Sequence, residues 1–432
     1  MDIRQICINA SEAANKMAAL DGETKNRALT RIAEALQNNK DKIIAANIKD
    51  LNRSQEEKLA SPLLKRLKFD EKKINDMVEG IRSLRGLEDP VGKTVLSTML
   101  DEELELYKVT CPIGVIGIIF ESRPDALVQI STLCLKSGNS VLLKGGREAI
   151  ETNKVLADVI REASEAAALP KGWITLLESR DDVNEMLKMD EYIDLVIPRG
   201  SNEFVRYIME HSRIPVMGHA DGICHVYVDG AASIDMAVRI TVDSKTQYVA
   251  VCNATETLLV DKAVAAEFLP VLKTELDKKN VEIFGDEETQ KIIAVKPASE
   301  ADWATEYLDY TISIRVVSGV EEAIKHINTY GSGHTDSIVT NNKANALKFM
   351  NLVDSGNVFW NASTRFSDGF KYGFGAEVGI STSKLHARGP VGLEGLTSYK
   401  YMLIGNGQIV DDYAANRKSF KHVKMDKHIE DI

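Results

Sequence analysis

Cys252 is the residue of this 432-residue chain whose type and position most directly suggest chemistry. It lies in the run Gln247–Val260, between the end of a helical pattern and a strand-like segment, where we expect a turn. A thiol on a turn can be partly exposed, and its thiolate is a nucleophile that backbone N–H groups of the same turn can support. The alternative is a cysteine buried in the core, which is the common situation for a single cysteine.

Two strand-to-helix corners could hold phosphate groups. At Lys144-Gly-Gly-Arg147, two cations flank two glycines that let a ligand approach the backbone, which suits a phosphorylated ribose. An ordinary basic turn would explain the same residues. At Gly200-Ser201, the N–H groups of a helix start could bind a pyrophosphate. The chain has no Gly-x-Gly-x-x-Gly after its first strand and no Walker loop.

The elements that must position these residues follow a regular alternation. A helical layer over residues 9–85 precedes two series of short apolar strands alternating with helices, from Gly114 to Ile197 and from His225 to Trp360. Such alternation predicts parallel sheets covered by helices on both faces. The predicted fold class is α/β, with two Rossmann-like doubly wound domains and the active site in the crevice between them.

Composition narrows the class of protein. The formal net charge of −11, without a basic stripe, argues against a nucleic-acid partner. The five cysteines are odd in number and widely spaced, which favours free thiols in a reducing compartment. No apolar run reaches ~18 residues, and the N-terminus lacks a signal-peptide core. We therefore expect a soluble, cytoplasmic protein without a membrane partner, and a solvated tail at the locally basic stretch Arg417–Lys427.

Six segments follow a pattern that is specific to one group of enzymes. They are Cys111–Asp125, Lys245–Gln247, Val251–Val260, Val317–Ile338, Asn361–Phe366 and Gly375–Pro390. Through these segments, and from about Ile3 to Ile409, the chain resembles the aldehyde dehydrogenase superfamily. The likeness is greatest to a branch that reduces an acyl phosphate. The fold that this resemblance implies is aldehyde-dehydrogenase-like, with a small β element for oligomerisation.

The resemblance also implies an activity. Cys252 would attack L-glutamate 5-phosphate, release phosphate and form a thioester, which NADPH would reduce to L-glutamate 5-semialdehyde in the second step of L-proline biosynthesis. The hydrolytic members of the superfamily carry a glutamate that activates water, whereas Pro215–Gly222 contains none, so the thioester would exchange with phosphate. NAD-dependent members carry a glutamate in the corner where Arg147 stands, and an arginine favours the 2′-phosphate of NADPH.

The resemblance assigns site residues one by one. The catalytic residues would be Cys252 and Asn253, the cofactor residues Ser122, Lys144, Arg147, Gly200, Ser201 and Glu306, and the substrate residues Arg123, Asn361, Ser363 and Arg365. No metal is expected. His326 and His334 are interpreted as structural, and His219, Cys224 and His225 as poor zinc geometry, although they lie close in sequence.

The same resemblance divides the chain and suggests partners. It predicts an NADP-binding domain over residues 1–221 with a β-hairpin arm at 98–111, a catalytic domain over 222–390, and a C-terminal return with an oligomerisation strand and tail over 391–432. Exposed edge strands predict a homodimer or a homotetramer. The chain carries no amino-acid kinase domain, so a separate glutamate 5-kinase would supply the acyl phosphate, by transient contact.

Two alternative functions stay open. The thioester could pass to coenzyme A, against which Asn361–Phe366 and Val317–Ile338 speak. The chain could also be a nucleotide-binding scaffold with a dead site, against which the intact Cys252-Asn253 pair speaks.

Overall fold

The computed structural model describes residues 2–59, 61–178, 181–219 and 221–431, which form two compact units. Unit 1 consists of Met1–Met217, Gly375–Val378 and Val391–Ile432, and unit 2 of Gly218–Phe374 and Gly379–Pro390. The first boundary therefore lies four residues before the predicted one at residue 221. Residues 391–432, predicted as a separate segment, belong to unit 1.

The centre of unit 1 is a four-stranded parallel sheet. Its strands are β3 (Val115–Phe120), β4 (Ser140–Gly145), β5 (Ile174–Leu176) and β6 (Leu195–Arg199), in the spatial order β5-β4-β3-β6. All residues of β3 and β4 are buried. Strands that are apolar on both faces need helices on both sides, as the alternation in the sequence predicts.

Helices supply that cover. Those between the strands are α6 (Pro124–Lys136), α7 (Ile150–Glu165), α8 (Asp181–Met186) and α9 (Asn202–His211). The N-terminal layer comprises α1 (Ile3–Met17), α2 (Gly22–Asn38), α3 (Lys40–Glu56), α4 (Ser61–Leu67) and α5 (Glu71–Gly86). Asp21 and Asp70 cap α2 and α5 by accepting backbone N–H bonds, a contribution of about 1 kcal/mol each. None of the described helices is long and apolar enough to cross a membrane.

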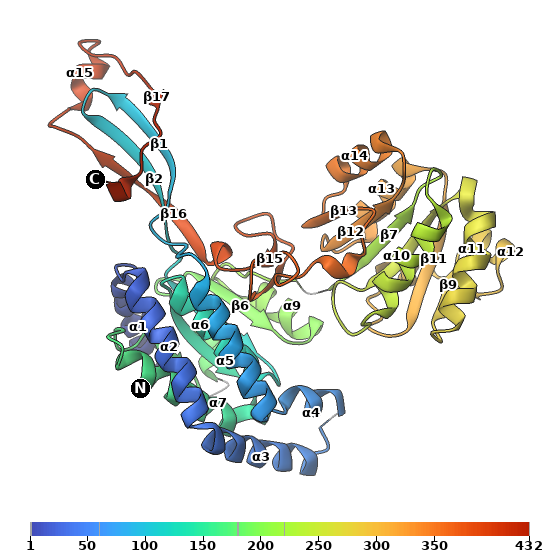
Figure 1. Ribbon diagram of the computed structural model, residues 1–432, viewed down its shortest axis with the longest axis horizontal. Coiled ribbons are helices and arrows are strands. Elements are labelled where there is room, and N and C mark those ends of the chain that lie inside the picture. The colour runs from blue at the N-terminus through green and yellow to red at the C-terminus, as the bar shows by residue number, and fades with distance from the viewer. Residues whose placement is uncertain (1, 60, 179–180, 220, 432) are drawn as a thin grey trace. The chain divides into compact units, whose positions relative to one another are not determined.

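An antiparallel arm extends from unit 1 (Figure 1). Its strands are β1 (Thr94–Asp101), β2 (Leu104–Pro112), β16 (Thr397–Ile404) and β17 (Val423–Lys424), in the order β16-β2-β1-β17. The stretch Arg417–Lys427, predicted as a solvated tail, is largely exposed. It is also bonded to the arm, because β17 pairs with β1 and Lys427 forms a 2.8 Å salt bridge with Glu105.

Unit 2 is a second α/β layer structure. Its parallel strands are β7 (Cys224–Val228), β8 (Thr255–Asp261), β9 (Glu282–Gly285), β10 (Lys296–Pro297), β11 (Thr311–Val317), β12 (Thr335–Val339) and β13 (Asn357–Trp360), in the order β10-β9-β11-β8-β7-β12-β13. The main helices are α10 (Ile234–Thr246), α11 (Lys262–Asp277), α12 (Glu287–Ile292), α13 (Val320–Tyr330) and α14 (Lys343–Leu352).

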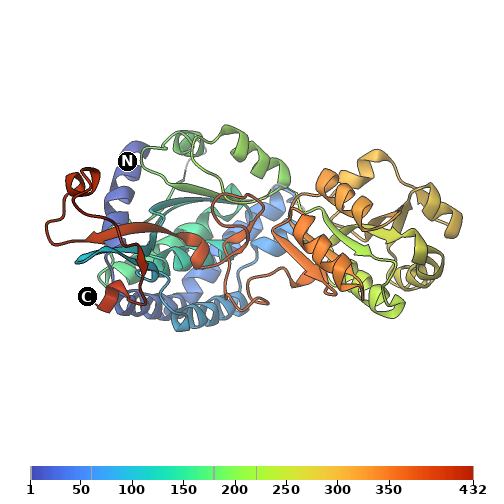
Figure 2. The same cartoon turned by 90° about the horizontal axis from the view of Figure 1, so that it is seen from above.

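Alternate residues of the central strands of unit 2 face two different cores. Leu258 and Val260 of β8 pack in the cluster with α10 and α11, whereas Leu259 packs in the cluster with α13 and α14. Successive side chains of a strand point to opposite faces, so the sheet is covered on both sides. Figure 2 shows the helices on either side of it. The predicted α/β fold class with two doubly wound layers is confirmed.

Candidate active site

Cys252 lies half-buried on a tight turn between α10 and β8. The turn is closed by a 3.1 Å hydrogen bond from the Ala254 N–H to the Val251 carbonyl. The Cys224 thiol donates to the Cys252 carbonyl over 3.1 Å, and a Cβ at Gly222 would lie 2.3 Å from the same oxygen. Only glycine allows so close a backbone approach. The backbone of Cys252 is therefore held at a fixed place, while the residue stays half-buried.

The loop around η3 (Thr364–Phe366) fixes this turn from the other side. Asn253 is buried, and its side-chain amide donates to the Ser367 carbonyl at 2.7 Å, while its backbone carbonyl accepts from Thr364 Oγ1 at 2.7 Å. Ser363 is buried as well, with its hydroxyl 3.1 Å from that of Ser244. The Asn253 side chain thus holds the loop against the turn, and Ser363 holds it against α10.

Arg365 and Asn361, both predicted for the substrate, differ in their surroundings. The Arg365 Nε donates to Gln247 Oε1 at 3.0 Å. Burial lowers the pKa of this guanidinium, and the electrostatic influence of Cys252 acts in the opposite direction. Asn361 has φ of 56°, and its amide both donates to and accepts from the backbone of Thr340, at 3.0 and 2.9 Å. Asn361 therefore shapes the loop, while Arg365 supplies a cation beside the thiol.

Two imidazoles, set aside by the sequence interpretation, also lie at this thiol. The Cys252 sulfur and one ring nitrogen each of His219 and His334 lie within 4.8 Å of one another. His334 is fully buried, and its Nε2 has no hydrogen-bond partner. His219 Nδ1 lies 2.7 Å from the Ile380 carbonyl. Only the positions of the two histidines in the chain could have indicated this. His219 stands in the segment Pro215–Gly222, where the hydrolytic members of the superfamily carry a water-activating glutamate, and His334 directly precedes β12 of the same sheet.

A buried ion pair lies at the beginning of the neighbouring strand. Lys245 Nζ and Glu256 Oε2 are 2.6 Å apart, and both side chains are fully buried. Burial raises the pKa of Glu256 to about 7, while Lys245 acts to lower it, and the charge of Glu306 raises it further. Glu306, predicted as a cofactor residue, therefore lies near this pair.

The predicted cofactor residues of unit 1 gather at the carboxyl ends of its strands. Ser122 follows β3 with φ of 45°, a left-handed conformation that is uncommon outside glycine and typical of functional corners. Its hydroxyl donates to Glu148 Oε1 at 2.9 Å, and its backbone N–H donates to the same oxygen. The corner after β3 is thereby bonded to the corner after β4.

Lys144 and Arg147 flank the two glycines after β4, as predicted. Lys144 is largely buried, and its Nζ donates to the Gly145 carbonyl at 2.7 Å. The Arg147 side chain is 72% exposed and forms a 3.1 Å ion pair with Glu57 at the end of α3. Exposed pairs of this kind contribute little, about 0–1 kcal/mol, so a phosphate could readily replace Glu57.

Gly200 and Ser201 lie exposed at the start of α9, after β6. The Ser201 N–H donates to the Glu121 carboxylate at 3.0 Å. An anion thus already occupies this helix start, where a phosphate oxygen would find the same donor. The donor set of two cations, two glycines and a helix N-terminus fits a phosphorylated dinucleotide.

The predicted site residues divide equally between the units. Ser122, Arg123, Lys144, Arg147, Gly200 and Ser201 belong to unit 1, and Cys252, Asn253, Glu306, Asn361, Ser363 and Arg365 to unit 2. Arg123, predicted for the substrate, is half-buried and directly precedes α6 in unit 1. Sequence reasoning missed Gly222, Cys224, His219 and His334 as neighbours of the thiol.

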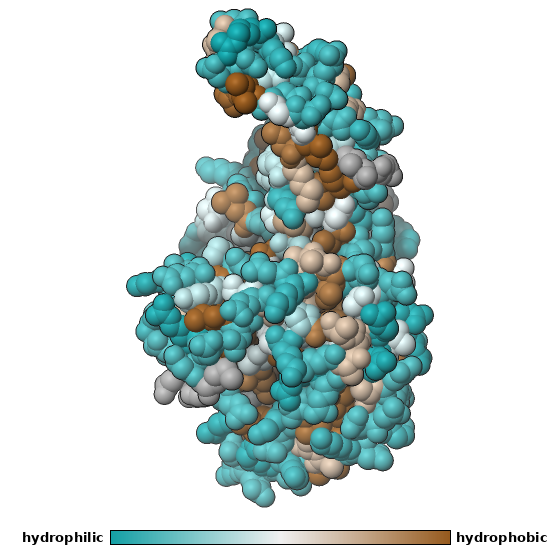
Figure 3. Space-filling view, turned by 90° about the vertical axis from the view of Figure 1, so that its left-hand side faces the viewer, coloured by the Kyte–Doolittle hydropathy of each residue, from teal (hydrophilic) through white to brown (hydrophobic). Residues whose placement is uncertain are grey.

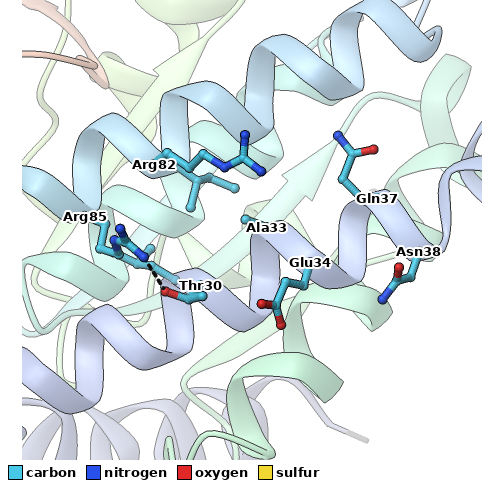
Figure 4. Close-up of a pocket in the computed structure, with 9 residues that line it drawn as sticks. Thr30, Ala33, Glu34, Gln37, Asn38, Arg82 and Arg85 are labelled. Atoms are coloured by element: carbon cyan, nitrogen blue, oxygen red, sulfur yellow. Dashed lines mark hydrogen bonds between the residues drawn. The ribbon is translucent and has the colours of Figure 1, made fainter.

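A separate pocket of about 310 Å³ opens on unit 1, and α2 and α5 line it (Figure 4). Arg85 Nη1 donates to Thr30 Oγ1 at 3.2 Å along its wall, and Glu34, Gln37 and Arg82 line the rest of its polar surface. None of the predicted site residues lines it.

Comparison with known proteins identifies the family of this chain. The profile of the Aldehyde dehydrogenase family matches residues 1–313. The gamma-glutamyl phosphate reductase of Ruminiclostridium cellulolyticum is 78% identical over 432 residues, which cover 100% of both chains. The chain belongs to the gamma-glutamyl phosphate reductases of the aldehyde dehydrogenase family.

Other members of this family agree in sequence and in structure. The gamma-glutamyl phosphate reductase of Acetivibrio thermocellus is 72% identical, covering 99% of both chains. The crystal structure of gamma-glutamyl phosphate reductase from Thermotoga maritima superimposes with a TM-score of 0.93 at 42% identity, covering 95% of this chain and 100% of that one. The resemblance seen in the sequence motifs is confirmed, and the chain is an enzyme of the oxidoreductase class.

Proposed function

We propose that this enzyme reduces L-glutamate 5-phosphate to L-glutamate 5-semialdehyde, with NADPH as reductant and release of phosphate. The substrate follows from the reaction for which its relatives are named. The observation that carries the mechanism is the half-buried thiol of Cys252, held on a turn by Cys224 and Gly222 beside the Arg365 guanidinium.

In the first step, the Cys252 sulfur attacks the γ-acyl carbon and the bond from that carbon to the phosphate oxygen breaks. The thiol proton passes to an imidazole of His219 or His334, whose ring nitrogens lie within 4.8 Å of the sulfur. Contacts of this length in a ligand-free site tighten when substrate binds. Inorganic phosphate leaves, and the glutamyl group remains on the sulfur as a thioester.

Two features of unit 2 would stabilise the charges that develop. Backbone N–H groups of the Cys252 turn serve as donors to the oxyanion, an effect of about 3 kcal/mol per donor. Arg365 meets the phosphate or the α-carboxylate, and Arg123 meets the other, since both substrate groups are anionic. Asn253, Asn361 and Ser363 position the loop that carries Arg365, through the hydrogen bonds described above.

NADPH, when bound, supplies the hydride that reduces the acyl group on Cys252. Lys144 and Arg147 would hold its ribose 2′-phosphate, and the N–H groups at Gly200-Ser201 its pyrophosphate, displacing Glu57 and Glu121. Ser122 and Glu306 are the remaining cofactor residues of this proposal. Unit 1 would thus be the NADP-binding domain and unit 2 the catalytic domain.

The experiment that tests the function runs the reaction backwards. Purified enzyme should reduce NADP only when L-glutamate 5-semialdehyde and inorganic phosphate are both present, and other aldehydes should be turned over far more slowly. Coenzyme A in place of phosphate is the matched control. Turnover with coenzyme A that equals turnover with phosphate, or NADP reduction that needs no acceptor, would overturn the proposal.

We also propose that the arm joins two copies of the chain. Strand β16 is an edge of its sheet and exposes Tyr399, Tyr401 and Leu403, which alternate along one face of the strand. Figure 3 shows apolar residues gathered on the arm. An edge of this length is usually paired, so we expect a homodimer or homotetramer that light scattering would detect and that Leu403→Glu would weaken. The transient contact with glutamate 5-kinase stays a prediction.

A further inference from the structure

The cluster of Cys252, His219 and His334 has a composition that the proposed reaction does not require. A single base is enough to deprotonate one thiol, whereas here two imidazoles lie near it. The sulfur and one nitrogen of each ring are within 4.8 Å of one another. A thiolate with two imidazoles is a ligand set that zinc prefers, and three protein ligands leave a fourth position open.

The state of the two rings supports a ligand role. The Ile380 carbonyl can only accept, so His219 donates from Nδ1, and Nε2 is the ring nitrogen left to bind a metal. A backbone carbonyl that fixes the far nitrogen of a histidine is the usual second contact of a metal-binding imidazole. In His334, Nδ1 lies 2.8 Å from the Thr335 hydroxyl and 3.6 Å from the Cys224 sulfur, and Nε2 is buried without a partner. A buried nitrogen without a partner costs free energy, and a bound cation would offset that cost.

The distances allow the site to close on an ion. Tetrahedral zinc holds sulfur and nitrogen ligands roughly 3.3–3.6 Å apart. Ligand atoms that lie up to 4.8 Å from one another must therefore approach by about 1.5 Å at most. Cys252 and His219 are both only half-buried, which leaves their side chains room to rotate. Cys224 is close by, but its thiol is fully buried and donates to the Cys252 carbonyl over 3.1 Å.

We propose that His219, Cys252 and His334 form a Zn²⁺ site that reversibly switches the enzyme off. As the sulfur–zinc bond forms, the thiol proton passes to water and no electron is transferred. The sulfur electron pair that attacks the acyl carbon is then occupied by the metal, and the thiol is protected from oxidation. The ion site stands on this geometry alone, whereas its effect on turnover rests on the proposed function.

Cobalt provides the direct test, since it reports its own ligands. Chelator-treated enzyme titrated with Co²⁺ should bind one equivalent and develop thiolate-to-cobalt charge-transfer absorption, which one equivalent of Zn²⁺ abolishes. Cys252→Ser should lose that absorption. His219→Gln and His334→Gln should each weaken binding by about 100-fold or more, the upper range for loss of a mere supporting contact. Cys111→Ser is the matched control, because Cys111 is the other half-buried thiol of the chain, and it should bind as the parent does.

Several results would overturn the proposal. Unchanged absorption in Cys252→Ser, loss of it in Cys111→Ser, or no uptake at stoichiometric concentrations would refute the site, provided that circular dichroism shows each variant folded. Turnover should fall in proportion to zinc occupancy and return on addition of a chelator. An enzyme that binds one zinc at Cys252 and still turns over would refute the inhibitory role. Failure of the proposed substrate would leave the cobalt titration unaffected, so the two proposals fail separately.

Discussion

The nucleotide corners of unit 1 and the thiol of unit 2 lie at opposite ends of the strands of their sheets. In unit 1, Ser122, Lys144 and Gly200 lie at the carboxyl ends of β3, β4 and β6, where ligands of doubly wound sheets usually bind. In unit 2, the thiol, His219 and His334 precede β8, β7 and β12 and so lie at the amino ends.

The two environments differ as much as the positions. Arg147 of unit 1 is largely exposed and paired with an exposed glutamate, whereas in unit 2 Lys245, Glu256 and His334 are fully buried. An exposed corner can exchange its partners for a ligand at little cost. The buried pair of Lys245 and Glu256 is satisfied within the fold, so these two residues hold one geometry. We infer that the first site suits a cofactor that comes and goes, and the second suits covalent chemistry.

The contrast between the two units predicts its largest effect on turnover at Cys252. Cys252→Ala should lower kcat by about 10⁴-fold or more, because a covalent route loses its nucleophile. NADPH affinity, measured by fluorescence titration, should stay unchanged, since the predicted phosphate contacts lie in unit 1. Cys111→Ala is the control. Residual turnover close to that of the parent enzyme would show that unit 2 does not supply the nucleophile.

The burial of unit 2 predicts a large stability effect at Lys245. Lys245→Met leaves Glu256 buried without its cation and should lower the free energy of unfolding by about 3–5 kcal/mol. The double variant Lys245→Met/Glu256→Leu should recover most of this loss, as urea titration would measure. Lys273→Met breaks an exposed pair with Asp277 and should cost less than about 1 kcal/mol. Equal losses in Lys245→Met and Lys273→Met would contradict the distinction.

The exposed corner of unit 1 predicts a change of cofactor preference. Arg147→Glu should reduce the preference for NADPH over NADH, measured as a ratio of kcat/KM values, by about 10- to 100-fold, since one charge-assisted contact is replaced by repulsion. Arg161→Glu changes another exposed arginine of unit 1, in α7, and should leave the ratio as it is. An unaltered ratio in Arg147→Glu would refute its contact with the 2′-phosphate.

A smaller effect concerns the pH dependence of stability. Burial lowers the pKa of His326 to about 3 from 6.5. Below pH 6.5, this imidazole therefore binds a proton in the unfolded chain but stays neutral in the folded one. The stability contributed by the neutral ring is therefore present above pH 6.5 and is lost as pH falls towards 3, by about 2 kcal/mol between pH 7 and pH 5. His326→Phe should remove this part of the dependence, and His428→Phe, at an exposed site, should not.

Contiguous patterns explain what could be predicted from the sequence. The strand–helix alternation predicted both sheets, and Lys144-Gly-Gly-Arg147 identified a corner whose residues are neighbours in the chain. His219 and His334 are far apart in sequence and meet Cys252 only because three strands are adjacent in the sheet of unit 2. Likewise, no pattern indicates that the amides of Asn253 and Asn361 bond to backbone carbonyls of the fold.

The tail shows the same limit at another place. Its basic composition predicted exposure, and the stretch is largely exposed. The pairing of β17 with β1 could not be predicted, because it depends on a strand more than 300 residues earlier in the chain. The local charge of a segment does not indicate which distant strand it pairs with.

The covalent intermediate is the most direct test of the central claim. Enzyme incubated with L-glutamate 5-semialdehyde and NADP, without phosphate, should be quenched in acid, digested and weighed by mass spectrometry. We predict one glutamyl group on the peptide that contains Cys252, and its disappearance when phosphate is added before the quench. A glutamyl group on any other side chain, or none on an enzyme that turns over, would contradict the account.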